Sequence, residues 1–211
     1  MKINFVTNNI YFKGGLKTNL RRGEKVLKEY KKEYPYLKSS THWQQRIDKM
    51  EDKRGGDFAK CQIIIDQYDN KINDMRIAVE SSIRPKKELK KLIAQHNLAN
   101  CGEITDIISE ILRKKKIKHK QVGFDIWDGF STGKDHIFCV IGTKKKADLT
   151  NPSTWGNSAV IIDGWLNFVL SIPDAIREYE NFYMAHHRPA PFYSDFDFKE
   201  EKQNAGINKF M

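Results

Sequence analysis

Hydrophobic residues in the first half of the chain recur at the three- to four-residue spacing of amphipathic helices. This spacing predicts helices over residues 16–34, 42–53, 58–82 and 86–95, separated by proline, glycine and serine residues. In the third of these helices the hydrophobic positions fall on one side, which is expected to face a core. Those positions are Ile64, Tyr68, Ile72, Met75 and Val79.

The second half of the chain contains short runs of consecutive hydrophobic residues, which are typical of buried strands. Strands are predicted over 121–127, 137–141 and 159–162. Helical spacing returns over 102–112, and again over 173–183, where a proline occupies the first turn. The expected fold class is therefore α+β.

The length of 211 residues suits one domain that buries a substantial core. Residues 1–90 are expected to form a mainly helical N-terminal layer of that domain, and residues 91–183 a core that carries the chemistry. Residues 184–211 are largely polar and charged, and are expected to form a flexible or loosely packed C-terminal tail.

The net charge is +10, which raises the question of nucleic-acid binding. The basic residues are scattered over several helices and loops, and no zinc-finger, basic-zipper or RNA-recognition signature accompanies them. Nucleic acid is therefore not an expected partner, whereas an acidic protein or an anionic membrane surface remains open. The basic runs are 13–22, 25–32, 84–91, 113–120 and 144–146.

Three cysteines at unrelated spacings predict neither a disulfide framework nor a metal site, and no cofactor is expected. They fit a reducing compartment, where a catalytic thiol survives. No hydrophobic run approaches the roughly 18 residues that span a membrane. The first nine residues lack the hydrophobic stretch of a cleaved secretory signal, so we expect a cytoplasmic location in the producing cell.

Cys101 stands at the predicted start of helix 102–112, after a polar, turn-prone stretch over 96–100. Free N–H groups and the positive end of the helix dipole stabilise a thiolate at such a position and lower a thiol pKa. Gly102 removes bulk beside the sulfur. The other two cysteines do not compete, because Cys139 lies inside a hydrophobic strand and Cys61 has no candidate base near it in sequence.

His136 opens the strand 137–141, and Asp163 closes the strand 159–162. If the two strands are neighbours, the carboxylate of Asp163 can meet the imidazole, fix its tautomer and stabilise its protonated form. Taken singly, Cys101 is an ordinary buried thiol, His136 a structural histidine and Asp163 part of a turn. Together the three residues follow the order nucleophile, base and orienting acid, which favours a catalytic interpretation.

Four further residues are candidates for the same site. Gln95, six positions before Cys101, is a candidate donor to an oxyanion, together with the backbone N–H of Cys101. Gly102 adjoins the sulfur, and Trp165 is placed to shield the contact between histidine and aspartate from water. Trp155 lies in the long connection 144–157, and we expect this connection to line a substrate groove, with Trp155 in contact with the substrate.

Residues 95–165 resemble papain-like and transglutaminase-like cysteine enzymes, especially those of the bacterial secreted effector and toxin type. The matching motifs are Asn100-Cys101-Gly102-Glu103, Asp135-His136-Ile137-Phe138 and Asp163-Gly164-Trp165, with glycine at the second position of the third motif where those proteins often have proline. The resemblance implies a nucleophile helix packed on an antiparallel sheet, to which the N-terminal helices predicted from the hydrophobic spacing are added. It covers about a third of the chain.

The resemblance also implies an enzyme that forms a thioester with a peptide or carboxamide carbonyl of a protein substrate, such as a host protein. Protease, glutamine deamidase and transglutaminase remain open, because all share the same first half-reaction. For a secreted effector, the resemblance implies export into a host cytoplasm through a specialised secretion system. The alternative is a basic adaptor without enzymatic activity that binds a partner protein on an inherited fold of the same kind.

Overall fold

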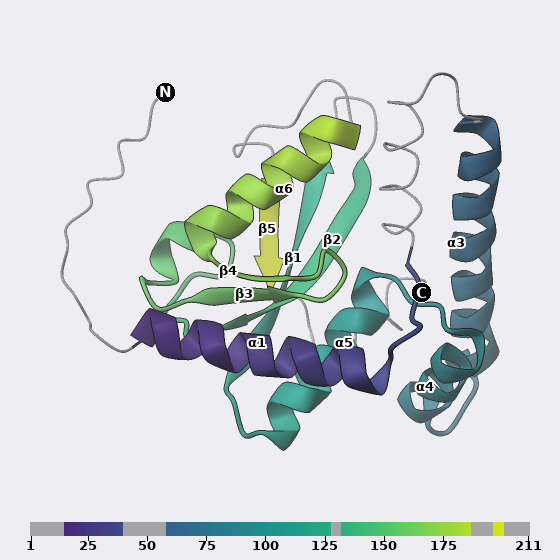
Figure 1. Ribbon diagram of the computed structural model, residues 1–211, viewed down its shortest axis with the longest axis horizontal. Helices are drawn as coiled ribbons and strands as arrows, with labels where there is room; N and C mark the ends of the chain where they lie inside the picture. Colours follow the sequence, from purple (N-terminus) through teal and green to yellow (C-terminus); the bar gives the residue numbers. More distant parts are fainter. Residues whose placement is uncertain (1–14, 40–57, 128–131, 187–195, 201–211) are drawn as a thin grey trace.

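The computed structural model describes residues 15–39, 58–127, 132–186 and 196–200 (Figure 1). These residues form an α+β fold with five α-helices and one antiparallel sheet of five strands. The helix predicted over 42–53 lies outside the described residues. No helix in the described ranges combines the length and hydrophobicity needed to cross a membrane.

The predicted helices are present with nearly the expected bounds in the described part of the chain. They are α1 (Gly15–Glu33), α3 (Phe58–Glu80), α4 (Pro85–His96), α5 (Cys101–Lys114) and α6 (Ile172–His186). The α4 helix ends at His96 and is capped by Asn97, which adopts a left-handed conformation with a φ of 55°. A short 3₁₀ turn, η1 (Pro152–Thr154), interrupts the connection after the second strand.

The sheet has the strand order β4-β3-β2-β1-β5, and every neighbouring pair is antiparallel. Three of its strands were expected, although β2 begins earlier than predicted and includes Thr132-Gly133. Two strands were missed, namely β4 and β5. The bounds are β1 (His119–Trp127), β2 (Thr132–Ile141), β3 (Val160–Asp163), β4 (Phe168–Ser171) and β5 (Phe196–Glu200).

The expectation of a loose tail from residue 184 onward is wrong for the segment Phe196–Glu200. This segment pairs with β1 as an edge strand, and Phe198 stands opposite Phe124. The Phe198 side chain is only 4% exposed, and its ring lies 5.4 Å from that of Phe124. Residues near the C-terminus therefore contribute to the core.

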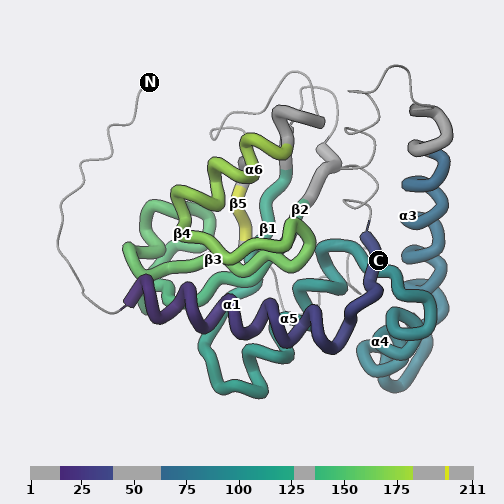
Figure 2. The backbone as a smooth tube through the Cα atoms, in the orientation of Figure 1, coloured from purple at the N-terminus to yellow at the C-terminus, as the bar shows by residue number. Residues whose placement is uncertain are grey.

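Helices cover both faces of the sheet (Figures 1 and 2). Successive residues along a strand point to opposite faces, so neighbours in sequence belong to different hydrophobic clusters. The α1 and α5 helices lie on one face, where Cys139 and Ile162 meet them; α3 and α4 extend this layer to one side. The α6 helix covers the other face, where it packs on Phe138 and Ile161.

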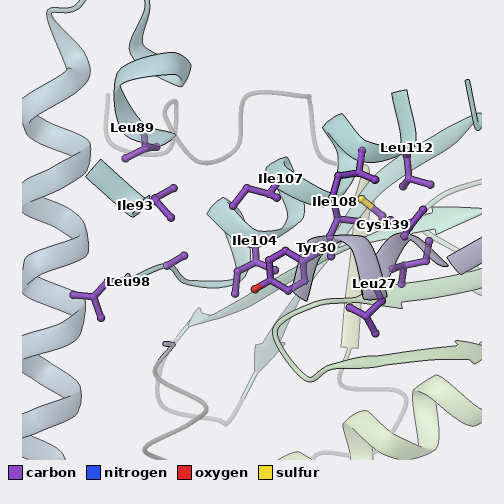
Figure 3. Packing of buried hydrophobic residues seen from close by; sticks show 14 of the residues in the cluster. Leu27, Tyr30, Leu89, Ile93, Leu98, Ile104, Ile107, Ile108, Leu112 and Cys139 are labelled. Carbon is purple, nitrogen blue, oxygen red and sulfur yellow. The ribbon is translucent and has the colours of Figure 1, made fainter. Parts of the chain in front are cut away.

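The core on the α1/α5 face joins four helices to the sheet (Figure 3). Tyr30 of α1 lies beside Ile104 of α5, and Leu89 and Ile93 bring α4 to the same cluster. The buried positions follow the helical spacing predicted from the sequence. Their packing holds α5 against α1 and the sheet.

Candidate active site

Cys101 is the first residue of α5, as the sequence predicts, and it is a partly exposed free thiol. Asn100 is the N-cap residue, and its backbone N–H donates to Oε2 of Glu103 at 3.0 Å. This is half of a capping box, which fixes the first turn of a helix. The sulfur is thereby held at a defined helix N-terminus beside the strand ends.

The start of α5 is also tied to α3 by polar contacts that sequence reasoning missed. Arg76 of α3 donates to both carboxylate oxygens of Glu103, at 2.7 and 3.0 Å, and the Glu103 side chain is fully buried. The Asn100 amide donates to Oδ1 of Asp69 at 2.8 Å. Burial raises the pKa of Asp69, and this effect exceeds the opposing effects of the Asn100 hydrogen bond and the Arg76 charge. The α3 helix therefore helps to position the start of α5, and with it the Cys101 thiol.

His136 and Asp163 meet as the sequence predicts. They come from the neighbouring strands β2 and β3, and His136 Nε2 lies 2.6 Å from Asp163 Oδ2. Each residue is only 1% exposed. A contact this short between a buried imidazole and a buried carboxylate is a charge-assisted hydrogen bond that orients the ring.

The Asp163 carboxylate accepts three hydrogen bonds besides the one from His136. The backbone N–H groups of Trp165 and Leu166 donate to Oδ1, each at 2.9 Å. The Tyr179 hydroxyl of α6 donates to Oδ2 at 2.9 Å. These donors satisfy the oxygens of the buried carboxylate and fix its position relative to His136. Tyr179 carries no local sequence signal, because only the packing of α6 on the sheet brings it to Asp163.

His136 favours its protonated form. Burial alone would lower its pKa, but the charge and hydrogen bond of Asp163 outweigh burial and, with a smaller contribution from Cys101, raise it to about 10. The ring is therefore an imidazolium at neutral pH, paired with the carboxylate.

Cys101 lies beside the same imidazole. Because Nε2 is engaged with Asp163, Nδ1 is the ring nitrogen available to the sulfur. Nδ1 makes no regular hydrogen bond within the described residues, whereas Cys101 lies close enough to interact with the ring and raise its pKa. The thiol is thus adjacent to the imidazole in a looser geometry than a regular hydrogen bond.

Aromatic rings surround His136 and exclude water. The Trp165 ring centroid lies 4.9 Å from that of His136, in the shielding position that the sequence predicts. The rings of Tyr179 and Phe124 meet the imidazole edge-on at 5.4 and 5.5 Å, and Phe138 lies 5.9 Å away. Electrostatic interactions are strengthened in such a low-dielectric shell.

The structure does not bring every candidate to the site. Trp155 is fully buried in the hydrophobic cluster on the α6 face of the sheet, and its Nε1 donates to the Asp148 carbonyl at 2.8 Å. The predicted substrate contact of Trp155 is therefore wrong, because the connection 144–157 folds its tryptophan into the core. Gln95 is exposed on α4, and no hydrogen bond within the described residues joins it to Cys101. Gly102 follows the cysteine in the first turn of α5, as expected.

Cys139 is an internal reference for an unreactive thiol. It lies in β2 with no exposed surface, and its Sγ donates to the Thr105 carbonyl at 3.6 Å. Burial raises its pKa well above the ordinary value. This agrees with the sequence-based view that Cys139 does not compete with Cys101.

A cleft of about 430 Å³ opens next to the site. Its wall includes Trp165, which packs on His136, and Ile104, which lies one turn after Cys101. Gly164 forms part of the wall at a very close approach, because a Cβ there would lie 2.5 Å from side-chain atoms of two α5 isoleucines. The small residue thus permits contact between the β3–β4 turn and α5 beside the cleft.

Within the described part of the chain, no group of three or more histidine, cysteine, aspartate or glutamate side chains is arranged to hold a metal ion. Comparisons with protein-family models, with curated proteins and with solved structures found no match for this chain.

Proposed function

We propose that this chain is a cysteine-dependent acyl-transfer enzyme with a papain-like or transglutaminase-like core, in which Cys101 is the nucleophile. One observation carries the proposal: a partly exposed thiol at a helix N-terminus lies beside a buried imidazolium that a buried carboxylate orients. Attack on a carbonyl needs a nucleophile in contact with a base, and an acid that orients the base.

In the first half-reaction, the Cys101 thiolate attacks the carbonyl carbon of a peptide or carboxamide. A C–S bond forms, the C–N bond breaks, and protonated His136 gives its proton to the departing amine. The product is a thioester on Cys101. Neutral His136 then takes a proton from water or from an amine, which attacks the thioester and releases the thiolate.

Asp163 acts on the reaction through His136. Its carboxylate holds Nε2 by a 2.6 Å hydrogen bond, so that Nδ1 remains available to the cysteine. The backbone N–H groups at the start of α5 are donors of the type that stabilises an oxyanion.

Proteolysis, deamidation and transamidation share this first half-reaction. The motif resemblance favours an enzyme that modifies a glutamine or another amide of a protein substrate, in the manner of a secreted effector. Product masses separate the alternatives: proteolysis cleaves the chain, deamidation replaces an amide by an acid, and transamidation adds an amine.

Intact-protein mass spectrometry after brief exposure to iodoacetamide tests the proposal. We expect fast modification at Cys101, with Cys139 unmodified, and a strong reduction in His136→Ala and Asp163→Ala. His119→Ala is the matched control, because His119 is a half-buried histidine that contacts Ser109 and the Ile117 carbonyl, away from Cys101. Equal labelling in all four proteins would instead support the basic adaptor without enzymatic activity.

A further inference from the structure

The cleft beside the candidate site lies between two segments that are distant in sequence. One side is formed by the end of α1 and residues 34–39, and the other by residues 164–167 of the β3–β4 turn. Ile104 of α5 lines the cleft between them. The volume of about 430 Å³ is enough for a few side chains of a bound peptide.

Two sets of contacts connect the cleft to the candidate site. Trp165 lines it and also packs on the His136 ring at 4.9 Å. On the other side, the Lys38 backbone N–H donates to the Asn97 carbonyl, and the Ala99 N–H donates to the Lys38 carbonyl. The segment around Lys38 therefore runs beside the residues that lead directly into Cys101.

The described residues that line the cleft carry charge of one sign. The charged ones are Lys31 and Lys38, and no carboxylate of the described residues lines the cleft. Both lysines are exposed, and neither forms an ion pair with a carboxylate of the described residues. Tyr30 and Tyr34 add hydroxyl groups. Two ammonium groups that have no carboxylate partner in the described part of the chain attract a ligand that carries negative charge.

We propose that this cleft binds an acidic stretch of the polypeptide substrate, next to the amide that Cys101 attacks. The proposal rests on the proposed function, since it assigns substrate selection to the same site. Lys31 and Lys38 are specificity-determining residues in this view: they pair with aspartate or glutamate side chains of the substrate, while Trp165 separates those charges from the His136–Asp163 pair.

The test measures binding without catalysis, in the Cys101→Ala variant, by fluorescence anisotropy. The probes are two fluorescein-labelled peptides with one central glutamine, one flanked by glutamates and the other by glutamines. We expect about tenfold tighter binding of the acidic peptide at low salt, because each exposed ion pair contributes modestly. The preference should shrink as ionic strength rises.

Charge reversal in the cleft provides the decisive comparison. Lys31→Glu/Lys38→Glu should abolish the preference for the acidic peptide. Lys25→Glu/Lys28→Glu changes the net charge equally on exposed positions of α1 outside the cleft, and should retain most of the preference. An equal loss in both double variants would show a general charge effect and overturn the proposal, as would a wild-type cleft without preference.

Failure of this proposal is distinguishable from failure of the proposed function. Fast, His136-dependent alkylation of Cys101 without any preference for the acidic peptide would overturn only the role of the cleft. Cleft-dependent binding of the acidic peptide with slow alkylation of Cys101 would support an acidic-peptide site and overturn the enzyme.

Discussion

Replacement of Asp163 by asparagine tests the buried pair most sharply, because the side chain keeps its shape and loses its charge. The carboxylate is 1% exposed and holds His136 Nε2 at 2.6 Å. Without the charge, burial dominates, and the pKa of His136 should fall from about 10 to below its ordinary value of 6.5. His136 then becomes neutral at neutral pH.

The magnitude follows from the same pair. A change from 6.5 to about 10 corresponds to about 5 kcal/mol between the two protonation states. Removal of one partner from a buried ion pair typically lowers the free energy of unfolding by about 3–5 kcal/mol. We therefore expect Asp163→Asn to lower the free energy of unfolding by several kcal/mol, measured by urea denaturation at neutral pH. Asp174→Asn, an exposed aspartate in an i,i+3 contact with Arg177, is the matched control and should change it by less than about 1 kcal/mol.

The pH dependence of stability gives a second readout. Because the pKa of His136 is raised in the folded protein, its contribution is fully present below pH 6.5 and is lost as pH rises toward 10. The unfolding free energy of the wild type should therefore decline across this window more steeply than that of Asp163→Asn. Parallel profiles, or a variant as stable as the wild type at neutral pH, would refute the buried charged pair.

Three further substitutions test the residues that hold Asp163 and the start of α5 in place. Tyr179→Phe removes the hydroxyl that donates to Asp163 Oδ2, and should cost about 1–2 kcal/mol in urea denaturation. Gly164→Ala places a Cβ 2.5 Å from two α5 isoleucines, and should lower the melting temperature through a loss of about 1–3 kcal/mol. Arg76→Ala leaves the buried Glu103 carboxylate without its cation, and should cost about 3–5 kcal/mol and increase hydrogen exchange at the start of α5.

Each of these changes has an outcome that contradicts its reasoning. A Tyr179→Phe protein with unchanged stability would mean that the hydroxyl does not support the carboxylate. Tolerance of Gly164→Ala would mean that the β3–β4 turn can move away from α5. For Arg76, the control is Lys91→Ala, which removes an exposed pair with Glu88 and should cost less than about 1 kcal/mol; equal effects would contradict the role of burial.

Local patterns predicted the parts of the fold that have strong local signals. The run Ile137–Ile141 is hydrophobic throughout because both faces of β2 are covered, and the helices show the spacing of their buried sides. Cys101 is predictable because it begins α5, and Asp163 because it ends β3, whereas His136 precedes the hydrophobic run of β2 but lies within the strand, which begins at Thr132. The pairing of β2 with β3 and the packing of α5 on β2 bring the three residues together.

The missed features depend on contacts between distant residues. Phe196 and Phe198 alternate with charged residues, but this short strand signal lies within a polar segment and acquires its meaning only from pairing with β1. Trp155 is buried partly because Phe198 packs against it, with ring centroids 5.9 Å apart. Likewise, the pairing of Arg76 with Glu103 depends on how α3 lies against α5, although the Asn100/Glu103 spacing itself signals a capping box.

The rate of Cys101 alkylation as a function of pH, in wild type and His136→Ala, shows whether His136 activates the Cys101 thiol. A thiol without a cationic neighbour has an ordinary pKa of about 8.5 and is only about 3% thiolate at neutral pH. We expect wild-type labelling that persists well below that range, and a rate in His136→Ala reduced by about 30-fold at neutral pH. Superimposable profiles that follow an ordinary thiol would contradict a cysteine activated by His136.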